Sequence, residues 1–186
     1  YRLATEKTKA KWIVLELSSY QLENCDHLKL DQSIITYLSS NHLERYKSLD
    51  SYYQTKLKIT SMTNGKCFFN NSSIDAVAYS KKSKCPAILV NAETFEDKKL
   101  LSKISLIGQH NKDNFSLAAE VANTCGWSEK SFVAMSQYQG LPHRLEFVAN
   151  INGVLYVNDS KATAMDSVLV AASGCLEKIN INSRLY

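Results

Sequence analysis

The sequence is poor in residues that interrupt regular structure. Its 186 residues include only two prolines and six glycines, and it has no internal repeat and no low-complexity tract. No apolar run approaches the roughly 20 residues that a membrane-spanning helix needs. We therefore expect no membrane partner. With 45% hydrophobic and 22% charged residues, the composition is that of a soluble globular protein.

The cysteines show no metal-binding pattern, and the positive charges are not gathered into a patch. The five cysteines are widely scattered, include no CxxC pair, and have no histidine at zinc-like spacing beside two of them. We expect reduced thiols in a cytosolic protein. The net charge of +4 is modest and the lysines are spread along the chain, so nucleic acid is not an indicated partner.

The two ends of the sequence indicate a piece of a longer protein. The start, YRLATEKTKAK, is polar and basic, unlike a signal peptide, and has no initiator methionine. The end, ININSRLY, has the pattern of an opening strand. We therefore expect an internal fragment.

Apolar runs alternate with helical patterns along the chain. Buried parallel strands are expected at 11–19, 33–40 and 85–90. Helices are expected after the cap residue Ser48, over 111–126 and over 128–138. This alternation predicts an α/β fold with a mostly parallel sheet flanked by helices.

The stretch TNGK (63–66) resembles part of a phosphate-binding loop, but the match fails. No glycine stands four residues upstream, and Cys67 occupies the place of the metal-binding Ser or Thr. Asn64-Gly65 instead predicts a β-hairpin turn.

The loop GLPHR (140–144) marks a domain boundary by its Gly and Pro. We assign 1–140 to one domain and 141–186 to the start of a second. The second begins with a hairpin, RLEFVAN and GVLYVND, and a helix with Met165 and Val168 on one side.

Polar residues gather at four strand ends or helix starts. Open α/β folds place their ligand sites at the carboxyl edge of the sheet, where such residues meet. The clusters are Glu16-Ser18-Ser19-Gln21, Asn41-His42 with Lys56, His110-Asn111-Asn114, and His143-Arg144 with Asp159-Lys161-Thr163.

Each cluster also has a purely structural explanation. Asp159 or Thr163 can cap a helix, as can the Asn111-Asn114 pair. His42 can be a satisfied loop histidine, and Lys56 can extend its ammonium to solvent from an apolar surface. A carboxylate such as Glu16 near the end of an apolar strand is costly unless a charged partner meets it.

Taken together, the clusters resemble the Mur ligases of bacterial peptidoglycan synthesis. Five blocks occur in the family's order: LELSSYQLE, NHLERYKSLDSYYQTKLKI, GQHNKDNFSLAAEVA, GLPHRLEF and NDSKAT. The resemblance runs from about Trp12 to Ser173. Tyr20-Gln21 and the DSKAT stretch at 159–163 favour the branch that adds D-glutamate.

The resemblance implies most of the family's central ATPase domain, of the P-loop type, followed by the start of a Rossmann-like C-terminal domain. It places the family's P-loop upstream of Tyr1. The implied reaction joins D-glutamate to UDP-N-acetylmuramoyl-L-alanine through an acyl phosphate, with ATP and two Mg²⁺, in a monomeric enzyme of the bacterial cytoplasm. The fragment alone is then expected to be inactive.

The resemblance also implies roles for single residues. Glu16 is a Mg²⁺ ligand, His42 binds a second Mg²⁺, and Lys56 carries a CO₂-derived carbamate beside it. Ser18 contacts the nucleotide substrate. Lys56, His42 and Lys161 are the expected catalytic residues.

The remaining roles concern ATP and the incoming amino acid. Asn111 and Asn114 lie near the adenine, and Arg144 and Asp159 meet the phosphates and ribose. Lys161 contacts the transferred phosphate, and Thr163 the D-glutamate carboxylate.

The chain departs from the family pattern at Asn41, where an acid is frequent, and at Ala164, where asparagine is usual. One alternative is another ligase of the superfamily, such as a folylpolyglutamate synthase, although SSYQLE and NDSKAT fit it poorly. The other is a non-catalytic protein: a module that binds nucleotide or nucleic acid, or a degenerate relative of the family that binds nucleotide.

Overall fold

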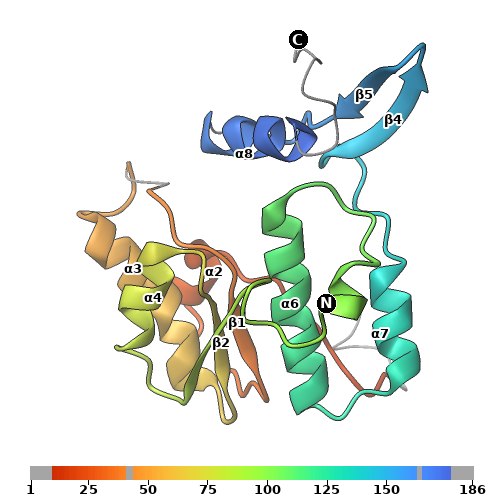
Figure 1. The fold of residues 1–186 in the computed structure, drawn as a ribbon. Coiled ribbons are helices and arrows are strands. Elements are labelled where there is room, and N and C mark those ends of the chain that lie inside the picture. The colour runs from red at the N-terminus through yellow and green to blue at the C-terminus, as the bar shows by residue number, and fades with distance from the viewer. Residues whose placement is uncertain (1–9, 41–43, 163–164, 177–186) are drawn as a thin grey trace.

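The computed structural model describes residues 10–40, 44–162 and 165–176, so His42, Thr163 and Ala164 lie outside the described part. Short helices and strands alternate along it (Figure 1). In chain order the elements are α2 (Ser19–Glu23), β1 (Ser33–Ile35), α3 (Leu49–Leu57), the 3-10 helix η1 (Lys58–Met62), β2 (Cys67–Asn70), α4 (Ile74–Ser80), β3 (Ala87–Val90), α5 (Lys98–Leu101), α6 (Gln109–Thr124), α7 (Glu129–Ser136), β4 (Glu146–Ile151), β5 (Val154–Asn158) and α8 (Met165–Leu176).

The strands β1, β2 and β3 form a parallel sheet in that order. Phe68 of β2 stands in register with Ile34 of β1 and Ile88 of β3. Helices α3 and α4 lie on one side of the sheet and α6 lies on the other (Figure 1). The predicted α/β fold, a parallel sheet flanked by helices, is confirmed.

The central strand β2 buries both of its faces because successive side chains point to opposite sides. Cys67 and Phe69 pack with Tyr52 and Tyr53 of α3 in one cluster. Phe68 packs between Val90 of β3 and Leu117 of α6 in another. The core therefore lies on both sides of β2, and α3 and α6 are held against it.

The predicted helices are confirmed, with small shifts at their ends. Ser48 caps α3, and its hydroxyl accepts a hydrogen bond from the Ser51 backbone N–H at 3.1 Å. The helix predicted over 111–126 begins at Gln109 and ends before Gly126, whose φ of 66° stops it.

The strand predicted at 11–19 is wrong. Residues 12–17 form no strand, and Ser18 and Ser19 belong to the start of α2. A buried parallel strand needs hydrogen-bonded neighbours, and this segment pairs with no described strand. Its apolar side chains, Ile13 to Leu15, are exposed as a result.

Two smaller predictions also need correction. The strand at 33–40 ends at Ile35, and the segment after it is irregular. Asn64-Gly65 is not a hairpin turn, because β2 runs parallel to β1. Gly65 is instead a close backbone approach: a Cβ there would lie 2.3 Å from the Asp31 carbonyl oxygen.

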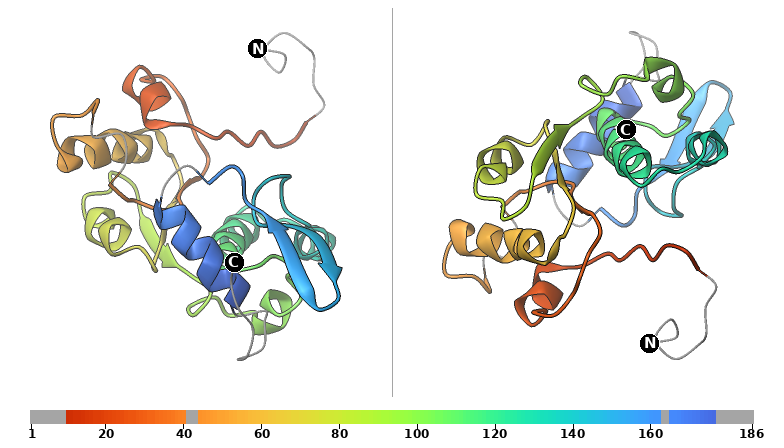
Figure 2. Two further views of the ribbon diagram at one scale, coloured as in Figure 1. Left: turned by 90° about the horizontal axis from the view of Figure 1, so that it is seen from above. Right: turned by 90° about the horizontal axis from the view of Figure 1, so that it is seen from below.

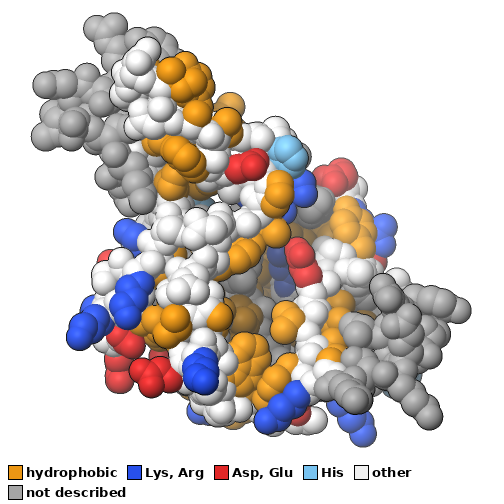
Figure 3. All heavy atoms as spheres, turned by 90° about the vertical axis from the view of Figure 1, so that its right-hand side faces the viewer, with side chains coloured by type: hydrophobic (Ala, Val, Ile, Leu, Met, Phe, Trp, Pro, Cys, Tyr) orange, Lys and Arg blue, Asp and Glu red, His pale blue; other side chains and the backbone are white. Residues whose placement is uncertain are grey.

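The hairpin of β4 and β5 is antiparallel, as predicted, and lies with α8 on the α6 and α7 side of the molecule (Figures 1 and 2). Apolar side chains on both elements are exposed, including Phe147, Ile151 and Leu169. Figure 3 shows hydrophobic side chains gathered over this upper part. Among the described helices, none is long and apolar enough to cross a membrane.

We expect Cys67 to be the last of the five thiols to react with iodoacetamide. Its side chain is fully buried, and burial raises the pKa of the thiol to about 12, while the other four cysteines are only partly buried. At pH 8 the thiolate fraction is then on the order of 10⁻⁴, and the thiolate is the nucleophile. Mass-spectrometric mapping of native and urea-unfolded protein checks this. Early alkylation of Cys67 in the native protein contradicts it.

Candidate active site

Ser18, in the first polar cluster, is the N-cap residue of helix α2. Its hydroxyl accepts a hydrogen bond from the Gln21 backbone N–H at 3.4 Å, and the Gln21 side-chain oxygen accepts one from the Ser18 backbone N–H at 2.8 Å. This reciprocal pair is a capping box, which Ser followed by Gln three residues later favours. Glu16 lies exposed in the irregular segment just before it.

Lys56 lies in the last turn of α3 and is partly buried. Its Nζ lies 5.0 Å from the ring centroid of Tyr52, one helical turn earlier. Burial disfavours the ammonium form and lowers the pKa of Lys56 below its ordinary value. Burial therefore makes the neutral amine, which is the form that captures CO₂, more accessible at Lys56 than at an exposed lysine.

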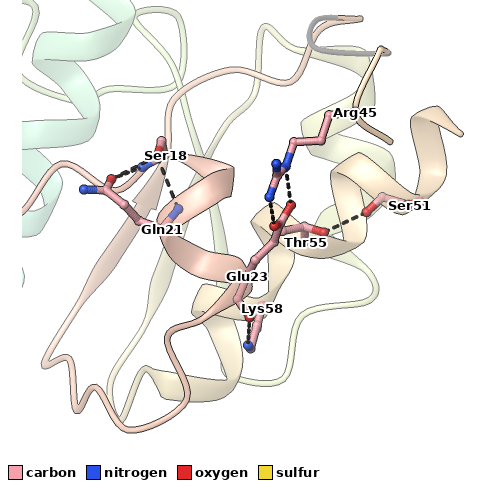
Figure 4. Close-up of polar contacts among 7 residues, drawn as sticks. All are labelled: Ser18, Gln21, Glu23, Arg45, Ser51, Thr55 and Lys58. Carbon is pink, nitrogen blue, oxygen red and sulfur yellow. Dashed lines mark hydrogen bonds and ion pairs between the residues drawn. The ribbon is translucent and has the colours of Figure 1, made fainter. Parts of the chain in front are cut away.

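Helices α2 and α3 are joined by contacts that centre on Glu23, the last residue of α2 (Figure 4). The guanidinium of Arg45 donates to both carboxylate oxygens, with Nε at 3.2 Å and Nη2 at 2.5 Å. The Lys58 ammonium donates to the Glu23 backbone carbonyl at 3.0 Å. The Arg45 guanidinium, with help from Tyr46, lowers the pKa of Glu23 to about 2.

The start of α6 is fixed by side chains that bond to the backbone. The Asn111 amide donates to the Ile107 carbonyl at 2.7 Å. The buried carboxylate of Asp113 accepts from the Ala92 N–H at 2.9 Å and from the Gln109 side chain at 3.1 Å. Asn114 is exposed. Asp113 thus joins the segment after β3 to the turn that carries both predicted adenine contacts.

The second half of the candidate site lies where the two ends of the β4–β5 hairpin meet. The Asp159 carboxylate accepts from the Leu145 N–H at 3.1 Å, and the Lys161 N–H donates to the His143 carbonyl at 3.2 Å. The side chains of Arg144 and Lys161 are exposed. The fold therefore brings Arg144, Asp159 and Lys161 together, although they are up to 17 residues apart in the sequence.

The two halves approach each other through a glycine pair. A Cβ on Gly174 of α8 would lie 2.9 Å from the Gly108 Cα, just before α6. Gly108 also has a φ of 92°, which only glycine adopts without strain. This close approach places the α8 end of the second half beside the helix that carries Asn111.

The residues present fit Mg²⁺ in part. Glu16 offers a carboxylate, and a carbamate on Lys56 would offer another hard oxygen donor. The described residues hold no group of three or more His, Cys, Asp and Glu side chains close enough for a metal, and His42 lies outside them. Among the described residues, Glu16 and a carbamylated Lys56 are therefore the groups that could offer oxygen donors to Mg²⁺.

Residues 2–122 match the family described as Mur ligase middle domain. The chain belongs to the Mur ligase family. Similar proteins include the UDP-N-acetylmuramoylalanine--D-glutamate ligases of Leptospira interrogans, at 33% identity over 84% of this chain, and of Oenococcus oeni, at 31% identity over 96%. The chain spans 38% and 45% of the lengths of these two relatives.

Among solved structures, MurF from Acinetobacter baumannii has the same fold, with a TM-score of 0.63 and 17% sequence identity. The match covers 81% of this chain and 38% of the MurF chain. A likeness at this identity concerns the fold and says nothing about the substrate. It agrees with the parallel sheet and flanking helices described above.

Sequence reasoning missed Glu23 and Arg45. Both stand inside blocks that carried the family resemblance, at the end of LELSSYQLE and within NHLERYKS. Opposite charges 22 residues apart give no pairing signal in a single sequence. The tertiary structure was needed to join them.

Proposed function

We propose that this chain is part of an ATP-dependent ligase that adds D-glutamate to UDP-N-acetylmuramoyl-L-alanine in bacterial, cytoplasmic peptidoglycan precursor synthesis. The observation that carries the proposal is the similarity to ligases named for D-glutamate over 84% to 96% of the chain. The domain division at 140/141 and the monomeric state remain part of this proposal.

The grouping of charges supports an ATP-driven amide synthesis. Forming an acyl phosphate brings a carboxylate and a triphosphate together, so the site must neutralise several negative charges. Arg144 and Lys161 supply exposed cationic side chains from one loop region. We assign Arg144 and Asp159 to the phosphates and ribose, and Lys161 to the transferred phosphate.

Other residues hold and orient the substrates. Asn111 and Asn114 stand in the first two turns of α6, where they face the adenine in this proposal. Ser18 contacts the nucleotide substrate in addition to its capping role, and Thr163 binds the D-glutamate carboxylate. Glu16, His42 and the Lys56 carbamate would hold Mg²⁺, which when bound offsets the charge of the phosphates and the acyl oxygen.

The amino-acid specificity is tested by phosphate release from ATP with the protein in its full natural length. We expect D-glutamate to be used with UDP-N-acetylmuramoyl-L-alanine at a rate at least about a hundredfold above L-glutamate, L-alanine or a diamino acid. Such discrimination is in the range that a site with paired polar groups achieves. Equal rates with L-alanine or a diamino acid reject the assignment to D-glutamate.

A further inference from the structure

Glu23 contacts the segments that flank α3 on both sides. Arg45, four residues before the helix begins, forms a two-point ion pair with the Glu23 carboxylate. Lys58, directly after the helix ends, donates to the Glu23 carbonyl and forms an ion pair with Asp26 at 2.6 Å. One residue of α2 therefore holds the chain before and after the helix that carries Lys56 (Figure 4).

The Arg45–Glu23 pair is better suited to fixing the orientation of the segment before α3 relative to α2 than to stabilising the fold. The side chains are 46% and 26% exposed, and exposed ion pairs contribute little to stability. The planar guanidinium, however, meets a carboxylate at two points in one orientation only. Its carbon also lies 4.6 Å from the ring centroid of Tyr20, so α2 contacts Arg45 on a second side.

These contacts fix the distance between two parts of the candidate site, Ser18 and Lys56. Ser18 stands at the beginning of α2 and Glu23 at its end, so the short helix connects the capping box rigidly to the ion pair. Lys56 is the second-last residue of α3, in its last turn. Any shift of α3 relative to α2 moves the Lys56 amine relative to Ser18.

We propose that Glu23 and Arg45 are positioning residues, which hold α3 so that Lys56 stands in a fixed place relative to the Ser18 segment. The proposal rests on the ligase function proposed above, because it gives Lys56 a role in turnover. Neither Glu23 nor Arg45 contacts the reacting groups in this proposal. Their effect passes through Lys56.

The test compares Glu23→Gln, Arg45→Lys and the exchanged pair Glu23→Arg with Arg45→Glu in the full-length enzyme. We expect each single change to lower kcat by about 10- to 100-fold, since small misplacements of a reacting group have effects of this size. The KM for ATP should stay within about twofold, because the assigned ATP contacts lie on other segments. The exchanged pair should recover most of the lost kcat.

Lys82→Gln is the matched control. It removes another exposed ion pair of α3, between Lys82 and Asp50 at 3.3 Å, but leaves Asp50 bonded to the Tyr79 hydroxyl. We expect unchanged kcat. If Glu23→Gln lowers the melting temperature and leaves kcat of the folded enzyme unchanged, the pair is only structural and the proposal is wrong.

Two further measurements separate this proposal from the proposed function. In the Lys56→Ala enzyme rescued by acetate, adding Glu23→Gln should change the rate less than twofold, since coupled residues are not additive; a full additional loss rejects the proposal. Hydrogen exchange in α3 should be about two- to fivefold faster in Glu23→Gln, in line with the modest energy of an exposed ion pair, and unchanged in Lys82→Gln. Unchanged exchange in Glu23→Gln rejects the positioning role even if the protein proves to have no ligase activity.

Discussion

Replacing Lys56 with alanine in the full-length enzyme is expected to lower turnover by about 100- to 1,000-fold, the usual cost of removing a group that stabilises charge in the transition state. Formate or acetate should restore part of the activity by occupying the place of the carbamate. Both effects are measured by steady-state phosphate release, first without acetate and then over about a 50-fold range of acetate concentration. In the proposed function, a carbamate on Lys56 serves as an oxygen donor, which alanine cannot supply.

Lys56→Arg separates this role from that of a simple surface cation. The guanidinium keeps its charge, cannot be carbamylated and fills the space that acetate would need. We expect an inactive enzyme that acetate does not rescue. Lys81→Arg, at an exposed lysine after α4, is the matched control and should be fully active. Near-normal activity of Lys56→Arg would falsify the carbamate role.

Phe68→Ala is expected to lower the free energy of unfolding by about 3–5 kcal/mol, the range for removing a buried aromatic side chain. Phe68 is 1% exposed and packs against Val90 and Leu117, so the change leaves a cavity between the sheet and α6. Since whole domains are stable by only about 5–15 kcal/mol, this loss is a large part of the total stability. Urea unfolding followed by circular dichroism measures the loss.

Ile74→Ala serves as the comparison, because Ile74 is 87% exposed at the start of α4. Its effect should stay within about 0.5 kcal/mol. Phe68→Leu should cost less than Phe68→Ala, since it retains part of the buried volume. Equal effects of Phe68→Ala and Ile74→Ala are incompatible with a core that depends on Phe68.

The helices could be predicted because their signals are local. Ser48 caps α3, and Gly126 follows the end of α6, where the backbone takes a positive φ. The hairpin of β4 and β5 was predictable for the same reason, since its two strands follow each other directly. Caps, turns and periodicity act over a few residues, so a sequence contains them in full.

The strands of the parallel sheet were less predictable, because a strand needs a partner distant in the sequence. The apolar run at 11–19 has the composition of a buried strand, yet residues 12–17 pair with no described strand. Gly65 was assigned to a hairpin turn because Asn-Gly is common there, whereas its place is set by the approach of the Asp31 carbonyl. Pairing is a property of the fold and not of the segment.

By itself, the sequence determined the α/β class, the Mur ligase resemblance and the residue types available to the site. Motifs and periodicity depend only on the order of the residues, so they can be identified without a structure. Only the tertiary structure decided that Asp159 bonds the Leu145 backbone, that Gly174 meets Gly108, and that Glu23 joins Arg45 and Lys58 across α2 and α3. These contacts link residues 14 to 66 positions apart. Their formation depends on how the helices pack on the sheet, which a single sequence does not specify residue by residue.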